Sequence, residues 1–161
     1  MMHSKPQKEH AWLEKLVGDW TYESECVMGP DQPVERFKGR ERVHMLGGYW
    51  MVADGQGEMP GGGTAKMVMT IGYDPSQKRY LGTWIGSMMP LMFIYDGKMD
   101  KAGKVLTLST EGPNFTAQGK MAKFQDIIEI KSANHRTLTS RMLGENGKWT
   151  QFMKADYKRK K

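Results

Sequence analysis

RTLTSRMLGENGKWTQFMKADY, residues 136–157, is the stretch that decides the fold. Two segments with alternating apolar and polar residues flank Asn146-Gly147, the strongest two-residue hairpin signal, because a type I′ turn needs positive φ at both central positions. The turn predicts that Glu145 pairs with Lys148. Counting away from the turn pairs Met142 with Gln151, Ser140 with Met153, Leu138 with Ala155 and Arg136 with Tyr157 on the inner face, and Arg141 with Phe152 and Thr137 with Asp156 on the outer face.

The rest of the chain repeats this pattern of short strands and turns. Segments rich in β-branched and aromatic residues are broken by Gly, Pro, Asn or Asp, with no intervening helices. A meander this long must either close into a barrel or split into two packed sheets to protect its edges, and the sequence leaves both open. The predicted strands span residues 20–28, 35–46, 49–58, 64–73, 79–88, 91–99, 104–111, 121–131, 136–144 and 148–158.

One helix is predicted, at the front of the chain. Pro6 fits a first helical turn, apolar residues follow at amphipathic spacing from Trp12 to Val17, and Gly18 ends the pattern. We therefore predict an all-β fold, a single closed antiparallel up-and-down β-barrel of about ten strands, with one short N-terminal helix. The predicted single domain at residues 1–161 consists of the helix at 6–17, the barrel at 20–158 and a basic tail at 159–161.

Composition limits the class of protein. With 161 residues and 39% hydrophobic content, the chain is long enough for one domain with a sizeable core. No stretch has the roughly 20 apolar residues of a membrane span, and the first ten residues lack the apolar core of a signal peptide, so we expect a cytoplasmic protein without membrane contact. Cys26 is the only cysteine, which excludes an internal disulfide and a cysteine zinc site. No metal site is predicted.

A series of short motifs extends over nearly the whole chain, and their order and spacing are fairly specific. They are His10-x-Trp12-Leu13-x-x-Leu16-x-Gly18-x-Trp20, Gly47-Gly48, Gly72-Tyr73-Asp74-Pro75, Tyr80 followed by Thr83-Trp84, Gly112-Pro113 and His135-Arg136-Thr137. With the basic C-terminal strand, this pattern resembles the bacterial DUF1579 family, a domain of unknown function. The resemblance implies a calycin-like barrel in the broad company of lipocalins, fatty-acid-binding proteins and nitrobindins. It implies no established activity.

Nitrobindins are similar in size and strand number and hold a ferric haem through a histidine, so we compared their motif. Their Gly-x-Trp-x-Gly-x-Gly pattern begins here as Gly18-Asp19-Trp20, but Tyr22 and Ser24 stand where glycines are expected. The histidines do not favour a haem ligand either, and we predict no haem and no other cofactor. His3 lies in the tail, His10 on the helix, His44 on the outward phase of its strand and His135 in a turn.

Carboxylates fall on two inward-facing strand faces. Glu41 alternates with apolar residues in the second predicted strand, as Asp126 does in the eighth, and an ionised carboxylate in an apolar interior needs partners. Ser140 and Gln151 also fall inward, so a few polar groups converge in an otherwise apolar lumen, as in small-molecule sites. We predict a lumen of several hundred Å³ that binds a small, partly apolar molecule. The predicted ligand contacts are Tyr22, Glu41, Trp50, Met67, Met69, Trp84, Asp126, Ser140, Gln151 and Met153.

Two other functions remain open. An enzyme could use Glu41 and Asp126 as general acid and base, although no catalytic motif is present and no catalytic residue is assigned. A polyanion or protein partner could bind the outer basic face, since the net charge is +6. Arg36, Lys38, Arg40 and Arg42 form that stripe, but Glu23 and Glu25 lie opposite, so we expect ion pairing and no binding of nucleic acid. A homodimer is compatible with the sequence.

Overall fold

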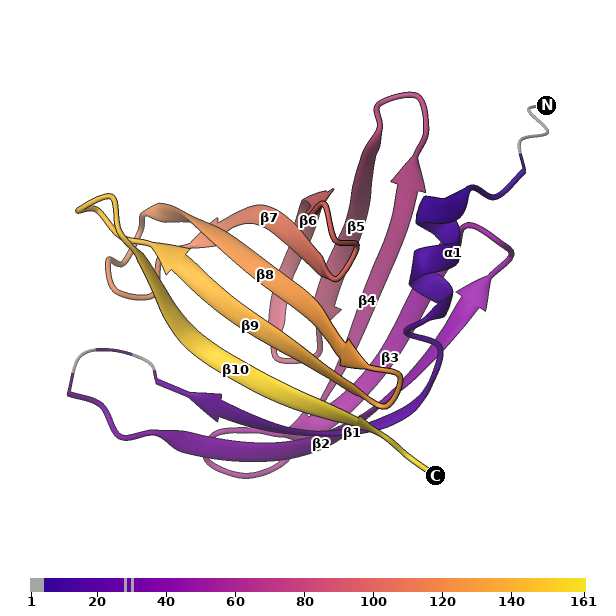
Figure 1. The fold of residues 1–161 in the computed structure, drawn as a ribbon. Coiled ribbons are helices and arrows are strands. Elements are labelled where there is room, and N and C mark those ends of the chain that lie inside the picture. The colour runs from indigo at the N-terminus through magenta and orange to yellow at the C-terminus, as the bar shows by residue number, and fades with distance from the viewer. Residues whose placement is uncertain (1–4, 28, 30) are drawn as a thin grey trace.

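The structure is a computed structural model that describes residues 5–27, 29 and 31–161, so the predictions for His3 and Met28 lie outside the described residues. It contains one helix and ten strands (Figure 1). Every strand lies within two residues of its predicted bounds. The elements are α1 Lys8–Glu14, β1 Gly18–Cys26, β2 Glu35–Leu46, β3 Trp50–Glu58, β4 Thr64–Asp74, β5 Arg79–Gly86, β6 Met89–Met99, β7 Val105–Pro113, β8 Met121–Ser132, β9 His135–Leu143 and β10 Trp149–Arg159.

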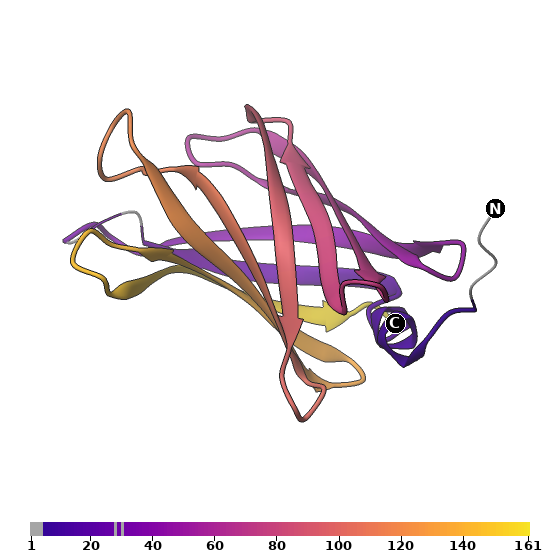
Figure 2. The same ribbon diagram turned by 90° about the horizontal axis from the view of Figure 1, so that it is seen from above.

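The strands form one closed barrel, and this excludes two packed sheets. Each strand pairs antiparallel with its neighbours in sequence, and β1 pairs with β10 to close the ring. Seen from above, the strands cross at steep angles and α1 lies at one end of the barrel (Figure 2). Closure leaves no free sheet edge at either end of the strand order.

The hairpin at Asn146-Gly147 is present, but the predicted two-residue turn is wrong. Gly144 N donates to Lys148 O, so the loop is longer, and Gln151 lies opposite Arg141 rather than Met142. A bulge at Phe152 then restores the predicted pairing, with Met153 opposite Ser140. The extra residue turns Phe152 inward, where its ring packs edge-on against Phe115 and Phe124. Burial of that aromatic ring outweighs the local preference of Asn-Gly for a tight turn.

The helix is shorter than the predicted 6–17 because its last carbonyls are bound by other groups. Beyond Glu14 the backbone bonds tighten, with Leu16 N donating to Leu13 O. Trp20 Nε1 donates to Leu16 O at 2.8 Å. Arg159 donates to the carbonyls of Val17 and Lys15. The chain therefore leaves the helix after two turns and enters β1 at Gly18.

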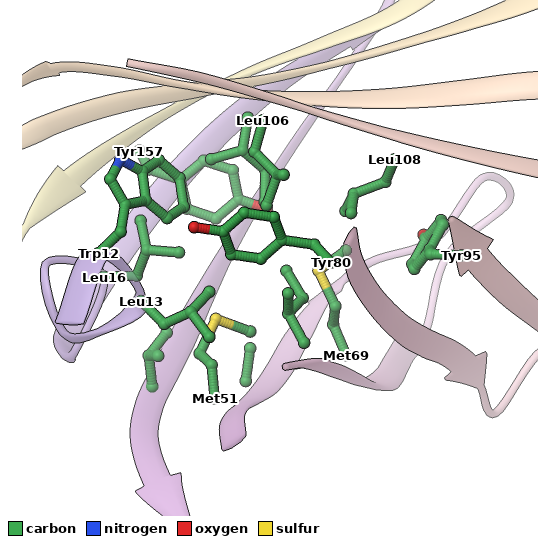
Figure 3. Packing of buried hydrophobic residues seen from close by; sticks show 14 of the residues in the cluster. Trp12, Leu13, Leu16, Met51, Met69, Tyr80, Tyr95, Leu106, Leu108 and Tyr157 are labelled. Carbon is green, nitrogen blue, oxygen red and sulfur yellow. The ribbon is translucent and has the colours of Figure 1, made fainter. Parts of the chain in front are cut away.

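Helix α1 closes one end of the barrel and fills it. Trp12, Leu13 and Leu16 pack with inward residues of the surrounding strands, as Figure 3 shows. Three hydrogen bonds hold the helix in place: Trp12 Nε1 to Gly103 O at 2.6 Å, Tyr80 Oη to Glu9 O at 3.0 Å, and one between His10 Nε2 and Tyr73 O at 3.1 Å. No helix in the described ranges has the length and hydropathy to cross a bilayer.

The barrel wall is incomplete between β6 and β7. These strands pair only from Asp96 to Met99, opposite Leu106 to Ser109. The preceding part of β6 pairs with β5 alone. The two strands diverge toward the end of the barrel that lies away from α1, and their parting is visible from above (Figure 2).

Candidate functional site

The interior of the barrel has two different halves. Near α1 the core is filled, and the void beside Glu41 and Arg136 measures only about 10 Å³. The predicted lumen of several hundred Å³ is therefore wrong for this half. In the other half, inner-wall side chains keep partial exposure, so solvent reaches them through the open end of the barrel or through the gap between β6 and β7. We call this half the cup, and its partly exposed inner-wall residues are Tyr22, Gly55, Met67, Trp84, Phe93, Phe152 and Met153.

Asp126 is the polar centre of one wall of the cup. It lies on β8, and its Oδ1 accepts a hydrogen bond from Ser140 Oγ on β9 at 2.6 Å, as predicted from the strand pairing. Tyr95 Oη on β6 donates to Oδ2 at 2.5 Å, a partner that the sequence analysis missed. Burial raises the pKa of the Asp126 carboxyl, while the bonds from Ser140 and Tyr95 oppose that rise.

The raised pKa of Asp126 predicts a specific pH dependence of stability. The folded state holds this proton more tightly than the unfolded chain, where the pKa of Asp is about 3.9. The stabilisation is thus complete below that pH and is lost as the pH rises through the folded-state pKa. Asp126→Asn, which cannot ionise, should remove this component.

Urea unfolding of wild type and Asp126→Asn at several pH values from 4 to 8 tests this prediction. The variant should gain stability relative to wild type as the pH rises. A constant difference between the two proteins across the series would contradict a raised pKa.

Glu41 and Arg136 form an ion pair at the bottom of the cup, where the cup meets the filled half of the barrel. Arg136 Nη2 donates to Glu41 Oε1; the arginine side chain is 5% exposed and the glutamate 15%. The guanidinium is stacked between two rings, 4.6 Å from the Trp20 centroid and 4.0 Å from that of Tyr157. Arg136 Nε is buried without a hydrogen-bond partner among the described residues. The void beside it is about the size of one water molecule.

Tyr22 lies across the inner wall instead of projecting into the centre. A Cβ at Gly39 or Gly57, which face each other on β2 and β3, would clash with its ring or hydroxyl. The hydroxyl has no hydrogen-bond partner among the described residues. Burial raises the pKa of Tyr22 to about 12, and the Glu41 carboxylate adds to the rise. A neutral O–H donor is thus available in the cup.

The other residues predicted to point inward lie at different depths between the mouth of the barrel and its filled half. Met67 lies beside Gly55, close to Glu41, and the Trp84 ring packs edge-on against Phe93 at 5.8 Å. Met153 lies opposite Ser140, at mid-depth. Met69 is 8% exposed and belongs to the filled core. Met67, Trp84 and Met153 therefore lie on the cup wall, whereas Met69 lies at its floor.

Two of the predicted ligand contacts do not face the interior, because their side chains point outward. Met51 and Ala53 face the core, so Trp50 faces the outside, where its ring covers Gly72. Gln151 is exposed because of the bulge at Phe152. The predicted two-residue turn placed Gln151 inward and Phe152 outward, so it missed Phe152 as an inner-wall residue. The inward position of Tyr95, in contrast, follows from simple alternation along its strand.

The outer basic stripe is largely neutralised, as expected. Arg36 pairs with Glu25, Lys38 with Glu23 and Arg42 with Asp19, all highly exposed. Arg40 donates to Gln56 Oε1 at 3.2 Å. His44 is outward and lies 3.8 Å from Asp54.

The predicted start of the basic tail and the predicted turn at His135 are both wrong. The tail does not begin at 159, because Arg159 ends β10 and binds the turn after α1. His135 begins β9 rather than lying in a turn, and its Nε2 is 2.9 Å from Asp156 Oδ1.

One hollow lies on the outer wall, where β6 and β7 part. It measures about 690 Å³, and we call it the side groove. Its apolar lining is Met92, Ile94, Phe124, Leu143 and Trp149; its polar lining is Ser109, Thr110, Glu111, Lys123 and Gln125. Several polar groups there are already paired, since Gln125 Oε1 accepts from Arg141 at 2.8 Å. A second outer hollow, beside Trp50, measures about 270 Å³.

Solved structures share this architecture at low sequence identity. Rv2717c from M. tuberculosis aligns with a TM-score of 0.67 and 12% identity, covering 98% of this chain and all of that one. The S-type phycobiliprotein lyase CPES from Guillardia theta aligns at 0.59 and 13%, covering 99% of each. EF1p2_mFAP2b bound to DFHBI aligns at 0.50 and 12%, covering 94% of this chain and 99% of that one. At these identities the likeness shows the fold alone.

The sequence comparison identifies the family. No curated protein matches this sequence. The family model described as "Protein of unknown function (DUF1579)" matches residues 5–159, from before α1 to the end of β10. The chain belongs to the DUF1579 family.

Proposed function

We propose that this protein binds a small, partly apolar molecule in the cup. One observation carries the proposal: aromatic and methionine side chains stay partly exposed on an inner wall, around the polar groups of Tyr22, Glu41 and Asp126. Such a site supplies apolar area for affinity and a few polar groups for orientation. Solved barrels of this fold include one bound to the small molecule DFHBI, which supports the proposal by analogy.

The cup is a better site than the side groove despite the volume of the latter. Small-molecule sites bury most of the ligand surface, about 70–90%. The side groove lies on the outside of the wall, and its apolar rim is highly exposed, with Met92 at 57% and Ile94 at 69%. A ligand there would lie largely exposed, whereas a ligand in the cup would be surrounded by strands except at the open end and at the gap between β6 and β7.

The alternatives have less support from the contacts. Glu41 is already engaged by Arg136, so it is not a free general base for a reaction with Asp126. The outer basic stripe is engaged in ion pairs, which reduces the charge available to a polyanion. Binding in the cup needs neither a reaction nor a free basic face.

Uptake of the uncharged fluorescent probe N-phenyl-1-naphthylamine tests the proposal. Its emission should rise on addition of the protein and saturate. Gly55→Phe places a ring in the cup, because the atoms nearest to a Cβ at that position, in Met67 and Glu41, are 3.7–3.8 Å away, and it should weaken binding at least tenfold. The matched control Gln56→Phe adds the same ring at the next, outward position of β3 and should bind like wild type.

A second control distinguishes the two hollows. Ile94→Gln alters the side groove without touching the cup, and probe affinity should not change. Failure of wild type to bind the probe, together with the mass of the bare chain in native mass spectrometry, would overturn the proposal. Loss of binding in Ile94→Gln but not in Gly55→Phe would also overturn it, in favour of the side groove.

A further inference from the structure

Basic and acidic side chains are distributed differently between the outer and inner faces of the barrel wall. Every lysine within a described strand lies on the outer face, because its neighbours on either side point inward. Carboxylates, in contrast, occur at inward positions on β2 and β8. The inward acidic residues are Glu35 at the mouth, Glu41 at mid-depth and Asp126 on the opposite wall.

Two arginines in the described strands point inward, and neither lies at the mouth to balance these carboxylates. Arg159 lies at the α1 end, where it donates to backbone carbonyls of Ala133, Val17 and Lys15. Arg136 is bound to Glu41 and is the less exposed partner, at 5% against 15%. The inward acidic side chains that have no arginine partner among the described residues are therefore Glu35 and Asp126, although the whole chain carries +6.

The acidic groups have acceptor capacity left. Asp126 accepts two hydrogen bonds, whereas a carboxylate offers about four lone-pair sites. Glu41 Oε1 is engaged by Arg136, while Oε2 faces Gly55 and the Met67 side of the cup, 3.8 Å from where a Gly55 Cβ would lie. Charge in a site with low-dielectric walls acts more strongly than at the surface.

Aromatic rings line the same space. Tyr22, Trp84, Phe93 and Phe152 are partly exposed inner-wall residues. Ring faces attract cations, and recognition of organic ammonium groups by aromatic walls is the main functional use of that attraction. Carboxylate acceptors and ring faces thus favour the same kind of ligand, one with a positively charged nitrogen.

We propose that the cup selects organic cations, specifically amines attached to an apolar, aromatic-sized body, over neutral and anionic molecules of the same shape. The proposal rests on ligand binding in the cup and names its ligand class. The apolar body lies against the methionine and aromatic wall, and the ammonium group lies toward Asp126 and the free oxygen of Glu41. The outer lysines and arginines, being on the other face of the wall, do not contact the ligand.

Three matched ligands test the selectivity: 2-(1-naphthyl)ethylamine, 1-naphthaleneethanol and 1-naphthylacetate, which share a ring system and differ in charge. Titration calorimetry at pH 7 and low salt should give the amine a Kd at least tenfold below that of the alcohol, with the acetate weakest. Asp126→Asn should raise the Kd of the amine at least fivefold and change that of the alcohol less than twofold. Glu25→Gln, an outer-face control, should alter neither.

The outcomes separate this inference from the proposed function. Equal affinity for all three ligands, or preference for the acetate, overturns the cation inference while ligand binding in the cup stands. Binding of none of the three and of no N-phenyl-1-naphthylamine overturns the proposed function itself. If Asp126→Asn does not fold, the ligand series on the unaltered protein still decides the inference.

Discussion

Glu41→Leu should lower the free energy of unfolding by about 3–5 kcal/mol, because it leaves the Arg136 guanidinium buried without a counter-charge. Arginine cannot escape this cost by losing its proton. The side chain also cannot turn toward water easily, since it is stacked between the Trp20 and Tyr157 rings. Urea unfolding followed by tryptophan fluorescence measures the loss.

The neighbouring strand offers a matched control for the Glu41 variant. Glu25→Leu makes the same substitution in an exposed cross-strand pair with Arg36, where the side chains are 58% and 74% exposed. It should cost no more than about 1 kcal/mol. The double variant Glu41→Leu/Arg136→Met should recover much of the loss, since no unpaired charge remains. Equal stability of Glu41→Leu and Glu25→Leu would show that burial adds nothing to the pair.

Gly82→Ala should destabilise the barrel by about 3 kcal/mol, at the upper end of overpacking effects. A Cβ at this inward position of β5 would clash with the backbone carbonyl oxygen of Thr70 on β4. Backbone in a paired strand cannot move aside as a side chain can, so relief requires the two strands to shift against each other. Chemical denaturation with near-UV circular dichroism reports both the stability and the packing.

Gly55→Ala is the control for the glycine substitution. It also adds a methyl group to an inward glycine, but the nearest atoms, in Met67 and Glu41, lie at 3.7–3.8 Å, an ordinary contact distance. The change in stability should stay within about 1 kcal/mol, because alanine also restricts the unfolded chain and so offsets any cost of packing the methyl group. A Gly82→Ala variant as stable as Gly55→Ala would contradict the close approach of β4 and β5.

The fold could be predicted from sequence because strand alternation and turn residues are local properties. The inward phase of β1, β2 and β8 was assigned correctly, and with it the positions of Tyr22, Glu41 and Asp126. Pairing of the outer basic stripe with β1 carboxylates followed from the short connection between the strands. Ten strands with short links also pointed to closure, which the β1–β10 pairing confirms.

The prediction from turn residues was wrong where contacts between residues far apart in the sequence outweighed the local turn preference. Asn146-Gly147 favours a tight turn, but inward burial of Phe152 against Phe115 and Phe124 stabilises a longer loop and a bulge. Gln151, counted inward from the turn, therefore lies outside. A shift of one residue exchanges the two faces of a strand, so a single bulge is enough to misplace a candidate contact.

By itself the sequence determined the strands, their inner and outer faces, the family motifs and the inward location of the carboxylates. Only the tertiary structure decided that Glu41 pairs with Arg136, that Tyr95 binds Asp126, and that α1 fills half of the interior. The physical reason is the separation in sequence between the residues that determine each feature. Alternation is read between adjacent residues, whereas contacts across a barrel join residues far apart in the chain, such as Glu41 and Arg136, and depend on closure, curvature and the packing of the helix.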